Sequence, residues 1–385
     1  MKILELKVEG FRSLKSVVWR PGDLNVVIGP NAGGKSNLLQ LLEMIAASAR
    51  GELAKFVKKQ GGMQPIVWDG KVREIKFSIS GKNHEKENLF ALYELTINRS
   101  DENSLYFIDE EQLEFEMDNT HLSIRGRPHY MIKDGNNVHK APENFFSDKE
   151  SFLFFSSGFY IKNPFISYYN KYLRSWSIFS DFQTGKESSI RQSFITSFEK
   201  EIVSNGQNFV SVLHTLYEED REFKKEINLA MQSAFGEDFE ELSFPPAADG
   251  RTQLRIRWKS LNTAQSAANL SDGTLRFLYL LTILAHPEPP ALIAIDEPET
   301  GLHPSMISII AEYAVESARK TQVIITTHSP EFLGAFRDTQ PTTTVCEWHD
   351  GQTQLRVLSG EKLDYWLKDY ILGELFKSGE LEGME

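Results

Sequence analysis

A glycine-rich segment from Gly29 to Ser36 (GPNAGGKS) constrains the fold of this 385-residue chain more than any other feature. It follows an apolar run, residues 24–28, that is typical of a strand buried on both faces. Apolar residues at helical spacing then continue from Lys35 until Gly51. Glycines let backbone N–H groups converge on phosphate oxygens, and the N-terminus of the following helix favours negative charge. The order of strand, glycine loop and helix therefore predicts an α/β fold that binds a triphosphate.

The residues of this loop have separate expected roles. The Lys35 ammonium is expected to reach the β and γ phosphates, and the Ser36 hydroxyl to bind Mg²⁺. A glycine-rich turn without a ligand is the alternative, and the strand and helix on either side of the loop disfavour it. The loop positions expected to contact the nucleotide are Gly29, Asn31, Gly33, Gly34, Lys35, Ser36 and Asn37.

Two acidic side chains follow a second buried strand, residues 292–295. The carboxyl ends of parallel strands are where α/β sheets place their ligands. Asp296 is expected to hold Mg²⁺ directly or through water, and Glu297 to orient or deprotonate the water that attacks the γ-phosphate. Two solvated acids at a strand end are the alternative, which the presence of the glycine loop disfavours.

A histidine ends a third apolar strand, residues 323–327. At the same sheet edge, His328 could hydrogen-bond the γ-phosphate and sense its hydrolysis. The alternative is a histidine that caps a helix or fills the core. Its place after the strand favours the functional interpretation.

The segment Leu270-Ser271-Asp272-Gly273-Thr274 opens an apolar helix. The Ser271 hydroxyl and the amides of Gly273 and Thr274 would then form an anion site at a helix N-terminus. The alternative is an ordinary helix N-cap, and the local sequence does not decide between the two.

The remaining pattern predicts several structural regions. Alternating apolar residues predict an antiparallel β-meander over about 72–130, and residues 254–258 a further strand. Helix is expected over 190–235, with Phe194, Ile195, Phe198 and Ile202 on one face, and again over 271–284 and 304–319. Residues 51–70 and 134–150 are expected to be loops. Near the C-terminus a helix is expected to present an apolar face that docks on the chain or on a partner: Leu363, Trp366, Leu367, Tyr370 and Ile371.

Composition excludes several classes of protein. The net charge of −12 and the pI near 5.4 argue against coating of nucleic acid by bulk positive charge, although a local basic strip stays open. The longest apolar stretch, Phe277 to Ala285, is short of the roughly 20 residues of a membrane span. The first residues lack a signal-peptide pattern. Cys346 is the only cysteine, so no internal disulfide can form. We expect a cytoplasmic protein without membrane contact.

Together these motifs resemble the ABC-type ATPases, specifically the AAA-family branch that contains RecF, SMC heads and the ATPase domains of OLD-type proteins. The resemblance covers residues 1–50 and 268–335 densely. The motifs that carry it are Gly-Phe-Arg-Ser at 10–13, the Gly29–Ser36 loop, Leu-Ser-Asp-Gly-Thr at 270–274, Ile-Asp-Glu-Pro-Glu at 295–299, Gly-Leu-His-Pro at 301–304 and Thr-His-Ser-Pro at 327–330.

The resemblance implies a P-loop NTPase fold with a mixed sheet, an antiparallel β-subdomain and an inserted helical lobe. It divides the chain into a RecA-like lobe, 1–185 with 286–385, and a helical lobe, 186–285. ATP and Mg²⁺ are the implied cofactors. A sandwich dimer or higher oligomer is implied, in which Ser271 and Gly273 of one subunit touch the γ-phosphate on the other. Arg12 is implied to lie near the nucleotide, and His303 in the loop that crosses the dimer interface.

The chain also departs from the family pattern. Asp272 stands where transporters carry glycine, and an acid beside a phosphate is unfavourable unless it points away or pairs with a cation. The loop containing His303 lacks the aspartate found in transporters. Gln183 is only a weak candidate for the glutamine loop. Fewer than 60 residues follow His328, too few for a Toprim nuclease domain, so we expect no nuclease in this chain.

The leading hypothesis is an ATPase whose nucleotide-gated dimerisation controls DNA maintenance or defence against phage, with the effector on a separate polypeptide. One rival is a regulatory or scaffolding protein that binds ATP with little turnover, against which Glu297 argues. Another is a transporter ATPase subunit. Three features argue against it: Asp272-Gly273 in the motif at 270–274, the Gly-Leu-His-Pro segment and the β-meander.

Overall fold

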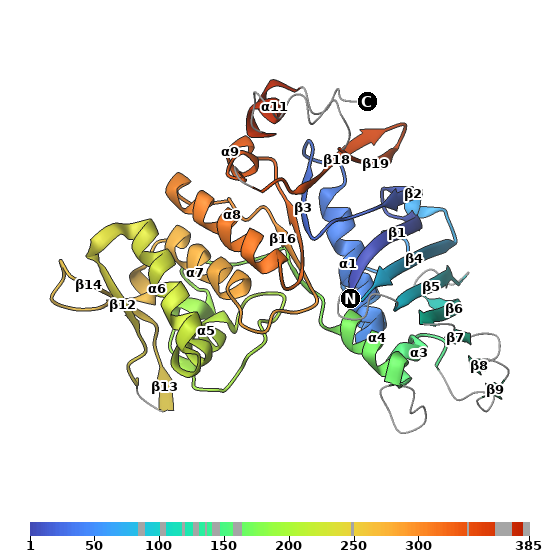
Figure 1. The fold of residues 1–385 in the computed structure, drawn as a ribbon, viewed down its shortest axis with the longest axis horizontal. Helices are drawn as coiled ribbons and strands as arrows, with labels where there is room; N and C mark the ends of the chain where they lie inside the picture. Colours follow the sequence, from blue (N-terminus) through green and yellow to red (C-terminus); the bar gives the residue numbers. More distant parts are fainter. Residues whose placement is uncertain are drawn as a thin grey trace. The chain divides into compact units, whose positions relative to one another are not determined.

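The computed structural model describes residues 1–83, 89–100, 105–117, 120–125, 131–134, 137–140, 147–156, 164–247, 250–336, 339–358 and 372–379. The chain forms two compact units (Figure 1). The first comprises Met1–Trp176 and Thr342–Ser359. The second comprises Ser177–Pro341 and the described residues near the C-terminus. The predicted division at 186 and 285 stays a prediction.

An antiparallel sheet of eight strands forms much of the first unit. Strands β4 to β7 are the predicted meander, which is confirmed where the structure describes it. Alternation of buried and accessible residues along β4 places Ile75, Phe77 and Ile79 in the core. The strands, in sheet order, are β2 (Leu14–Trp19), β1 (Lys2–Phe11), β4 (Glu74–Lys82), β5 (Phe90–Arg99), β6 (Tyr106–Met117), β7 (Thr120–Arg125), β8 (Met131–Asp134) and β9 (Asn137–Lys140).

The predicted strand, loop and helix around Gly29 to Ser36 are confirmed in the first unit. Strand β3 (Leu24–Ile28) is buried along its whole length and pairs in parallel with β18 (Thr342–His349). Strand β18 continues into β19 (Gln352–Val357) as an antiparallel hairpin. Helix α1 (Lys35–Arg50) follows the loop and ends where Gly51 adopts a left-handed conformation at φ 72°. The loop thus lies directly between a buried strand and a helix.

Three helices described in this unit contact α1: α2 (Leu53–Lys59), α3 (Phe152–Ser156) and α4 (Pro164–Arg174). The short 3₁₀ turn η1 (Trp68–Gly70) follows α2 in the sequence. The amide of Asn170 on α4 donates to Ala49 O at 3.0 Å and to Leu153 O at 2.8 Å, which joins three helices. The prediction of a loop over 51–70 is wrong at α2, because Leu53, Phe56 and Val57 bury one helical face.

A parallel βαβ unit forms the centre of the second unit, as predicted. Strands β10 (Ser177–Phe179), β16 (Leu292–Asp296) and β17 (Gln322–Thr326) pair in parallel in this order. Helix α8 (Pro304–Ala318) connects β16 to β17, and α9 (Pro330–Gly334) follows β17. The carboxyl ends of β16 and β17 therefore deliver their following residues to one sheet edge.

Helices and short strands make up the rest of the second unit. The helices are α5 (Phe209–Glu219), α6 (Arg221–Phe235), α7 (Asp272–Leu284) and α11 (Leu372–Ser378). The 3₁₀ turns are η2 (Ser189–Arg191), η3 (Gly236–Asp238) and η5 (Ala267–Asn269). The short strands are β11 (Phe194–Ile195), β12 (Phe239–Ser243), β13 (Arg251–Thr252), β14 (Arg255–Trp258) and β15 (Gln265–Ser266).

The helix predicted to start at residue 190 is wrong for its first part. Ile195 lies in the two-residue strand β11, and Ile195 and Phe198 are 68% and 83% exposed. Polar side chains hold this segment instead: Ser197 Oγ lies 2.8 Å from Ser211 Oγ, and the Val203 amide donates to Asn208 Oδ1 at 3.0 Å. Such local bonds compete with helix formation. Helix begins only at α5.

Two further expectations concern the chain ends and membranes. The apolar face expected at Leu363, Trp366, Leu367, Tyr370 and Ile371 lies outside the described residues. Within the described ranges, no helix has the length and apolarity needed to cross a membrane.

Candidate functional site

Close packing against the β18–β19 hairpin restricts the Gly29–Ser36 loop to glycine at three positions. Gly29 and Gly34 have φ of 142° and 110°, values that side chains rarely allow. An added Cβ would lie 2.1 Å from Cys346 O at Gly29, 2.7 Å from the same oxygen at Gly33, and 2.1 Å from Thr353 Oγ1 at Gly34. The hairpin therefore holds the loop in one conformation.

A chain of hydrogen bonds supports the same loop. The Asn37 side chain donates from Nδ2 to Ser13 Oγ at 2.6 Å, and Ser13 Oγ lies 2.7 Å from Thr353 Oγ1. Thr353 Oγ1 in turn donates to Gly33 O at 2.9 Å. The Cys346 thiol also donates to Gly33 O, at 3.2 Å, and its burial raises its pKa to about 12, so it stays protonated. Sequence reasoning missed the supporting roles of Ser13, Cys346 and Thr353.

The cation of the loop is Lys35, at the first position of α1. Its side chain is almost fully buried, and Nζ donates to Gly29 O at 2.8 Å and to Pro30 O at 3.2 Å. The ammonium thus lies inside the curve of the loop that the glycines form. Asn31 and Ser36 are exposed at its rim. This combination of a cation and a glycine-lined loop fits a polyphosphate.

Arg12 is held by residues after α1. Its backbone is left-handed at φ 47°, and its amide donates to Ile66 O at 2.7 Å. Its guanidinium Nη2 donates to Gln60 Oε1 at 2.7 Å, while Nε is buried without a hydrogen-bond partner in the described part of the chain. Partial burial lowers the pKa of Arg12 from its usual value. Its predicted place near the nucleotide stays a prediction.

In the second unit, the ends of β16 and β17 bring Asp296 and Thr326 side by side. The two residues pair in register, and Thr326 Oγ1 donates to Asp296 Oδ1. The next residue, Glu297, has φ 45°, and its amide donates to Thr326 O at 3.0 Å. Arg276 on α7 donates from Nη2 to Glu297 O at 2.7 Å. The left-handed turn is unusual for a residue with a side chain and directs the chain sharply away from the strand.

The structure also brings together the two predicted catalytic residues. His328 Nδ1 lies 2.9 Å from Glu297 Oε1, so the ring donates to the carboxylate. Both side chains are accessible, at 50% for His328 and 34% for Glu297. The contact orients the Glu297 carboxylate. The second ring nitrogen of His328, Nε2, takes no part in this contact.

A buried acid beside this pair was missed by sequence reasoning. Thr327 Oγ1 donates to Glu299 Oε1 at 2.5 Å, and the Ser329 amide donates to Thr327 Oγ1 at 2.9 Å. Burial raises the pKa of Glu299 from its usual value. The bond joins the segment after β16 to the segment after β17, which are the segments that carry Glu297 and His328. Nothing in the local sequence distinguishes Glu299 from a solvated acid.

The segment from Leu270 to Thr274 forms the N-terminus of α7, and its Ser271 is an N-cap. Ser271 Oγ accepts from the Thr274 amide at 3.0 Å, which confirms the ordinary capping role. An added Cβ at Gly273 would lie 2.6 Å from Gly301 O, so a close backbone approach requires glycine there. His303 caps α8, accepting from the Ser305 amide at 3.3 Å. The predicted contacts of Ser271, Gly273 and His303 across a dimer stay predictions.

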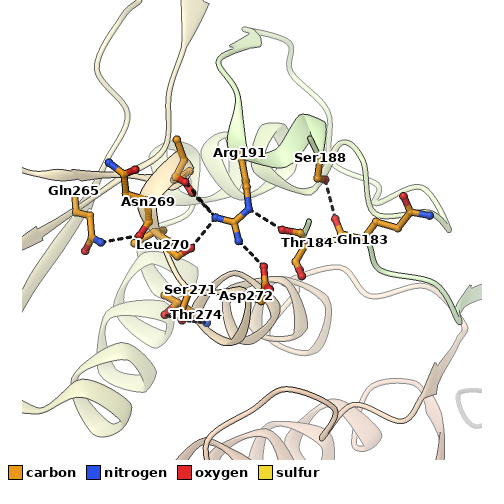
Figure 2. Close-up of polar contacts among 12 residues, drawn as sticks. Gln183, Thr184, Ser188, Arg191, Gln265, Asn269, Leu270, Ser271, Asp272 and Thr274 are labelled. Atoms are coloured by element: carbon orange, nitrogen blue, oxygen red, sulfur yellow. Dashed lines mark hydrogen bonds and ion pairs between the residues drawn. The ribbon is translucent and has the colours of Figure 1, made fainter. Parts of the chain in front are cut away.

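The acid of that segment, Asp272, pairs with a cation. Arg191 Nη2 lies 2.5 Å from Asp272 Oδ1 (Figure 2). This meets one of the conditions under which an acid can lie beside a phosphate. Gln183 is exposed and donates from Nε2 to Asp181 Oδ2 at 3.3 Å. Its role as a glutamine-loop residue stays a prediction.

The family described as "AAA domain, putative AbiEii toxin, Type IV TA system" matches residues 24–334 of this chain. The chain belongs to this AAA family. Its fold is similar to that of an SMC head bound to the C-winged helix domain of ScpA, with a TM-score of 0.53 at 13% identity, covering 95% of this chain and 100% of the other. It is also similar to the Pyrococcus furiosus Smc head bound to the C-terminal domain of ScpA, with a TM-score of 0.52 at 12% identity, covering 95% and 98%.

A sequence relative matches part of the chain. The "DNA replication and repair protein RecF" of Moorella thermoacetica is 33% identical over 105 residues. The match covers 26% of this chain and 26% of that protein, so the chain spans about a quarter of its relative's length. The family match shows that the chain belongs to the AAA family, and the SMC heads show that it has the α/β fold expected from the sequence.

Oxygen-bearing side chains in each unit are candidates for holding Mg²⁺. Among the residues that the structure describes, no group of three or more His, Cys, Asp or Glu side chains could hold a metal. Mg²⁺ in NTPases characteristically takes one or two protein ligands and completes its shell with phosphates and water. Ser36 is exposed in the first unit and Asp296 is partly accessible in the second, so each stays a candidate for one such oxygen ligand.

Proposed function

We propose that this protein hydrolyses ATP and that ATP joins two copies of it, so that dimerisation is coupled to DNA maintenance or to defence against phage through a separate effector. The observation that carries the catalytic part is the contact of 2.9 Å between His328 Nδ1 and Glu297 Oε1 after two parallel strands. Membership of an AAA family supports ATP as the substrate.

The proposed roles follow from the chemistry of each group. The loop from Gly29 to Ser36 binds the phosphates, and Lys35 offsets their charge. Glu297 accepts a proton from the attacking water, while His328 holds the carboxylate in place and offers Nε2 to a phosphate oxygen. Ser36 and Asp296 would hold Mg²⁺, which when bound neutralises charge on the β and γ phosphates. Catalysis in this design is mainly positioning and charge stabilisation.

Dimerisation through ATP is the second part of the proposal. Ser271 and Gly273 of one copy are proposed to contact the γ-phosphate bound by the other copy. The accessible start of α7 supports this, since a helix N-terminus favours an anion. The biological setting is supported by the RecF relative, whose name refers to DNA replication and repair, and by the family description, which names a toxin of a toxin–antitoxin system.

The test compares wild type with Glu297→Gln and His328→Ala. Glu297→Gln is expected to lower kcat by about 10²- to 10⁴-fold, as loss of a general base does, and to accumulate an ATP-bound dimer. His328→Ala is expected to lower kcat less, because the carboxylate remains. ATP turnover is measured with Mg²⁺, with and without DNA, and dimers by analytical ultracentrifugation. Equal turnover of wild type and Glu297→Gln would disprove hydrolysis at this site, and indifference to every DNA form would remove the DNA-maintenance setting.

A further inference from the structure

A buried guanidinium lies beside the start of α7. Arg191, the last residue of η2, is 7% exposed at its side chain. Nη1 donates to Leu270 O at 2.6 Å and Ala267 O at 3.1 Å, with a longer contact of 3.4 Å to Ala268 O. A buried arginine is costly unless its donors are satisfied and its charge is paired. Three carbonyls of the segment that leads into Ser271 satisfy much of this requirement.

The other two nitrogens of the Arg191 guanidinium bind a side chain and a second part of the chain. Nη2 pairs with Asp272 Oδ1 at 2.5 Å, and Nε donates to Thr184 O at 2.6 Å (Figure 2). Asp272 itself is 67% exposed, so its charge faces solvent while its partner is buried. The arginine therefore binds residues 267–272 at both their backbone and the Asp272 side chain; we call these residues, which lead into the Leu270–Thr274 motif, the signature segment.

The contact at Thr184 connects the signature segment to the stretch after β10. Ser188 Oγ donates to Gln183 O at 2.7 Å, so the stretch 183–191 folds back on itself around Arg191. Figure 2 shows Gln183, Thr184 and Ser188 to the right of the Arg191 guanidinium, Asp272 below it, and Leu270, Ser271 and Thr274 below and to its left. One side chain thus joins two segments that lie about 80 residues apart in the sequence.

We propose that Arg191 is the positioning residue of the signature segment: it fixes residues 267–272 and offsets the charge of Asp272, so that the start of α7 can face a phosphate of ATP on a second copy of this chain. The proposal rests on the ATP-dependent dimer of the proposed function. An unpaired carboxylate at the first turn of α7 would repel the phosphate that the helix N-terminus attracts. Pairing with Arg191 removes this conflict and explains how a family signature tolerates an acid at this position.

The test uses the full chain in the Glu297→Gln background, where the ATP-bound dimer accumulates. Arg191→Met removes the donors and the charge at similar length, and Asp272→Asn removes the acid alone. The double variant combines them. Arg319→Met is the matched control, because Arg319 is 72% exposed and pairs with Glu316. The dimer dissociation constant with ATP is measured by analytical ultracentrifugation at 50 and 300 mM salt, and ATP affinity at protein concentrations far below that constant.

Arg191→Met is expected to weaken the dimer about tenfold or more, as loss of charged hydrogen bonds does, and to leave ATP affinity of the dilute protein within about twofold. Adding Asp272→Asn is expected to recover about threefold or more at low salt, and less at high salt. Asp272→Asn alone is expected to change the dimer at most about twofold. An unchanged dimer in Arg191→Met, a double variant no better than Arg191→Met, or an Asp272→Asn dimer weakened tenfold would each overturn the proposal.

A second measurement separates this proposal from the proposed function. Hydrogen exchange in the nucleotide-free protein reports the order of residues 267–274 without any dimer. Arg191→Met is expected to raise exchange at these amides more than at α8, and Arg319→Met is not. If the Glu297→Gln protein itself forms no dimer with ATP, the proposed function fails while the exchange result still tests the positioning role. Unchanged exchange at 267–274 in Arg191→Met would refute that role, and a variant too unstable to purify is replaced by Arg191→Lys, which keeps the charge but not the fork of donors.

Discussion

The glycine loop Gly29–Ser36 of the first unit and the strand-end residues Glu297 and His328 of the second are held by different means. The loop is fixed through its backbone, because Gly29, Gly33 and Gly34 lie where no Cβ fits against Cys346 and Thr353. Glu297 and His328 are accessible side chains that orient each other through one hydrogen bond. Rigid backbone suits the proposed binding of phosphates by the loop, whereas accessible side chains suit the proposed exchange of protons with water by Glu297 and His328. Substitutions in the glycine loop and at buried or accessible acids should therefore change ATP affinity and the free energy of unfolding in different ways.

Substitution of Lys35 is expected to have the largest effect, and the property that it changes is the affinity for ATP. Lys35→Met removes the buried ammonium but leaves the glycines and the hairpin that shape the loop. ATP affinity is expected to fall roughly 100-fold, since a desolvated charged contact to a phosphate is worth about 2–3 kcal/mol. Thermal stability is expected to stay nearly unchanged. Isothermal titration calorimetry and thermal denaturation measure the two quantities.

The matched control for this prediction is Lys55→Met. Lys55 is 81% exposed and pairs only weakly with Glu52, at 3.6 Å. It should bind ATP as wild type does. If Lys35→Met bound ATP normally, the loop would not be the phosphate site. If it unfolded instead, the lysine would be part of what shapes the loop, and the contrast between backbone and side chain would fail.

Substitution of Gly34 is expected to have the next largest effect, on the free energy of unfolding. Gly34→Ala places a Cβ 2.1 Å from Thr353 Oγ1 at a φ of 110°. The free energy of unfolding is expected to fall by about 2–3 kcal/mol, from strain and overlap together. Gly351→Ala is the control in the same unit, because its φ of 79° is also positive but nothing lies within 4 Å of the added Cβ. It should cost only about 1 kcal/mol. Equal losses in urea denaturation would show that close packing of the loop contributes nothing.

Patterns local in sequence predicted the elements around the site. The run 24–28, the loop and the helix to Gly51 were read correctly because each signal is contiguous. Glu297 and His328 were expected at the same sheet edge because parallel strands end there, and their contact confirms this placement, although the contact itself was not predicted. A role of Leu270–Thr274 in a dimer was suggested only by the family resemblance, since local chemistry alone left the segment undecided between an anion site and an ordinary cap.

Contacts between distant parts of the chain could not be predicted in this way. Thr353 and Cys346 support Gly33 from more than 300 residues away, and no local pattern marks them. Arg191 likewise looks like any polar residue until Asp272 is beside it. The helix expected at Phe198 failed for the opposite reason: its apolar spacing was regular, yet the residue is exposed. Periodicity predicts a helix only where tertiary packing buries the apolar face.

Glu111 gives the smallest effect and extends the comparison to a buried acid of the first unit. Unlike Glu297, Glu111 is almost fully buried, and it accepts from Tyr93 Oη at 2.7 Å and from the Phe152 amide at 2.8 Å. Burial raises its pKa to about 7 despite these bonds. Because the folded pKa lies above the unfolded value near 4.5, the folded state holds the proton more tightly. The stability that this proton provides is complete below about pH 4.5 and is lost as pH rises through 7.

The change that tests this is Glu111→Gln, which imitates the protonated acid at every pH. Between pH 5 and pH 8, wild type should lose on the order of 2 kcal/mol of unfolding free energy that the variant does not lose. Urea denaturation at four pH values across this range gives both curves. Glu331→Gln serves as the control, because that exposed acid has a lowered pKa and should not produce the same divergence. Parallel curves for wild type and Glu111→Gln would mean that the hydrogen bonds to Glu111 fully offset its burial. The carboxylate would then be as stable inside the protein as in water.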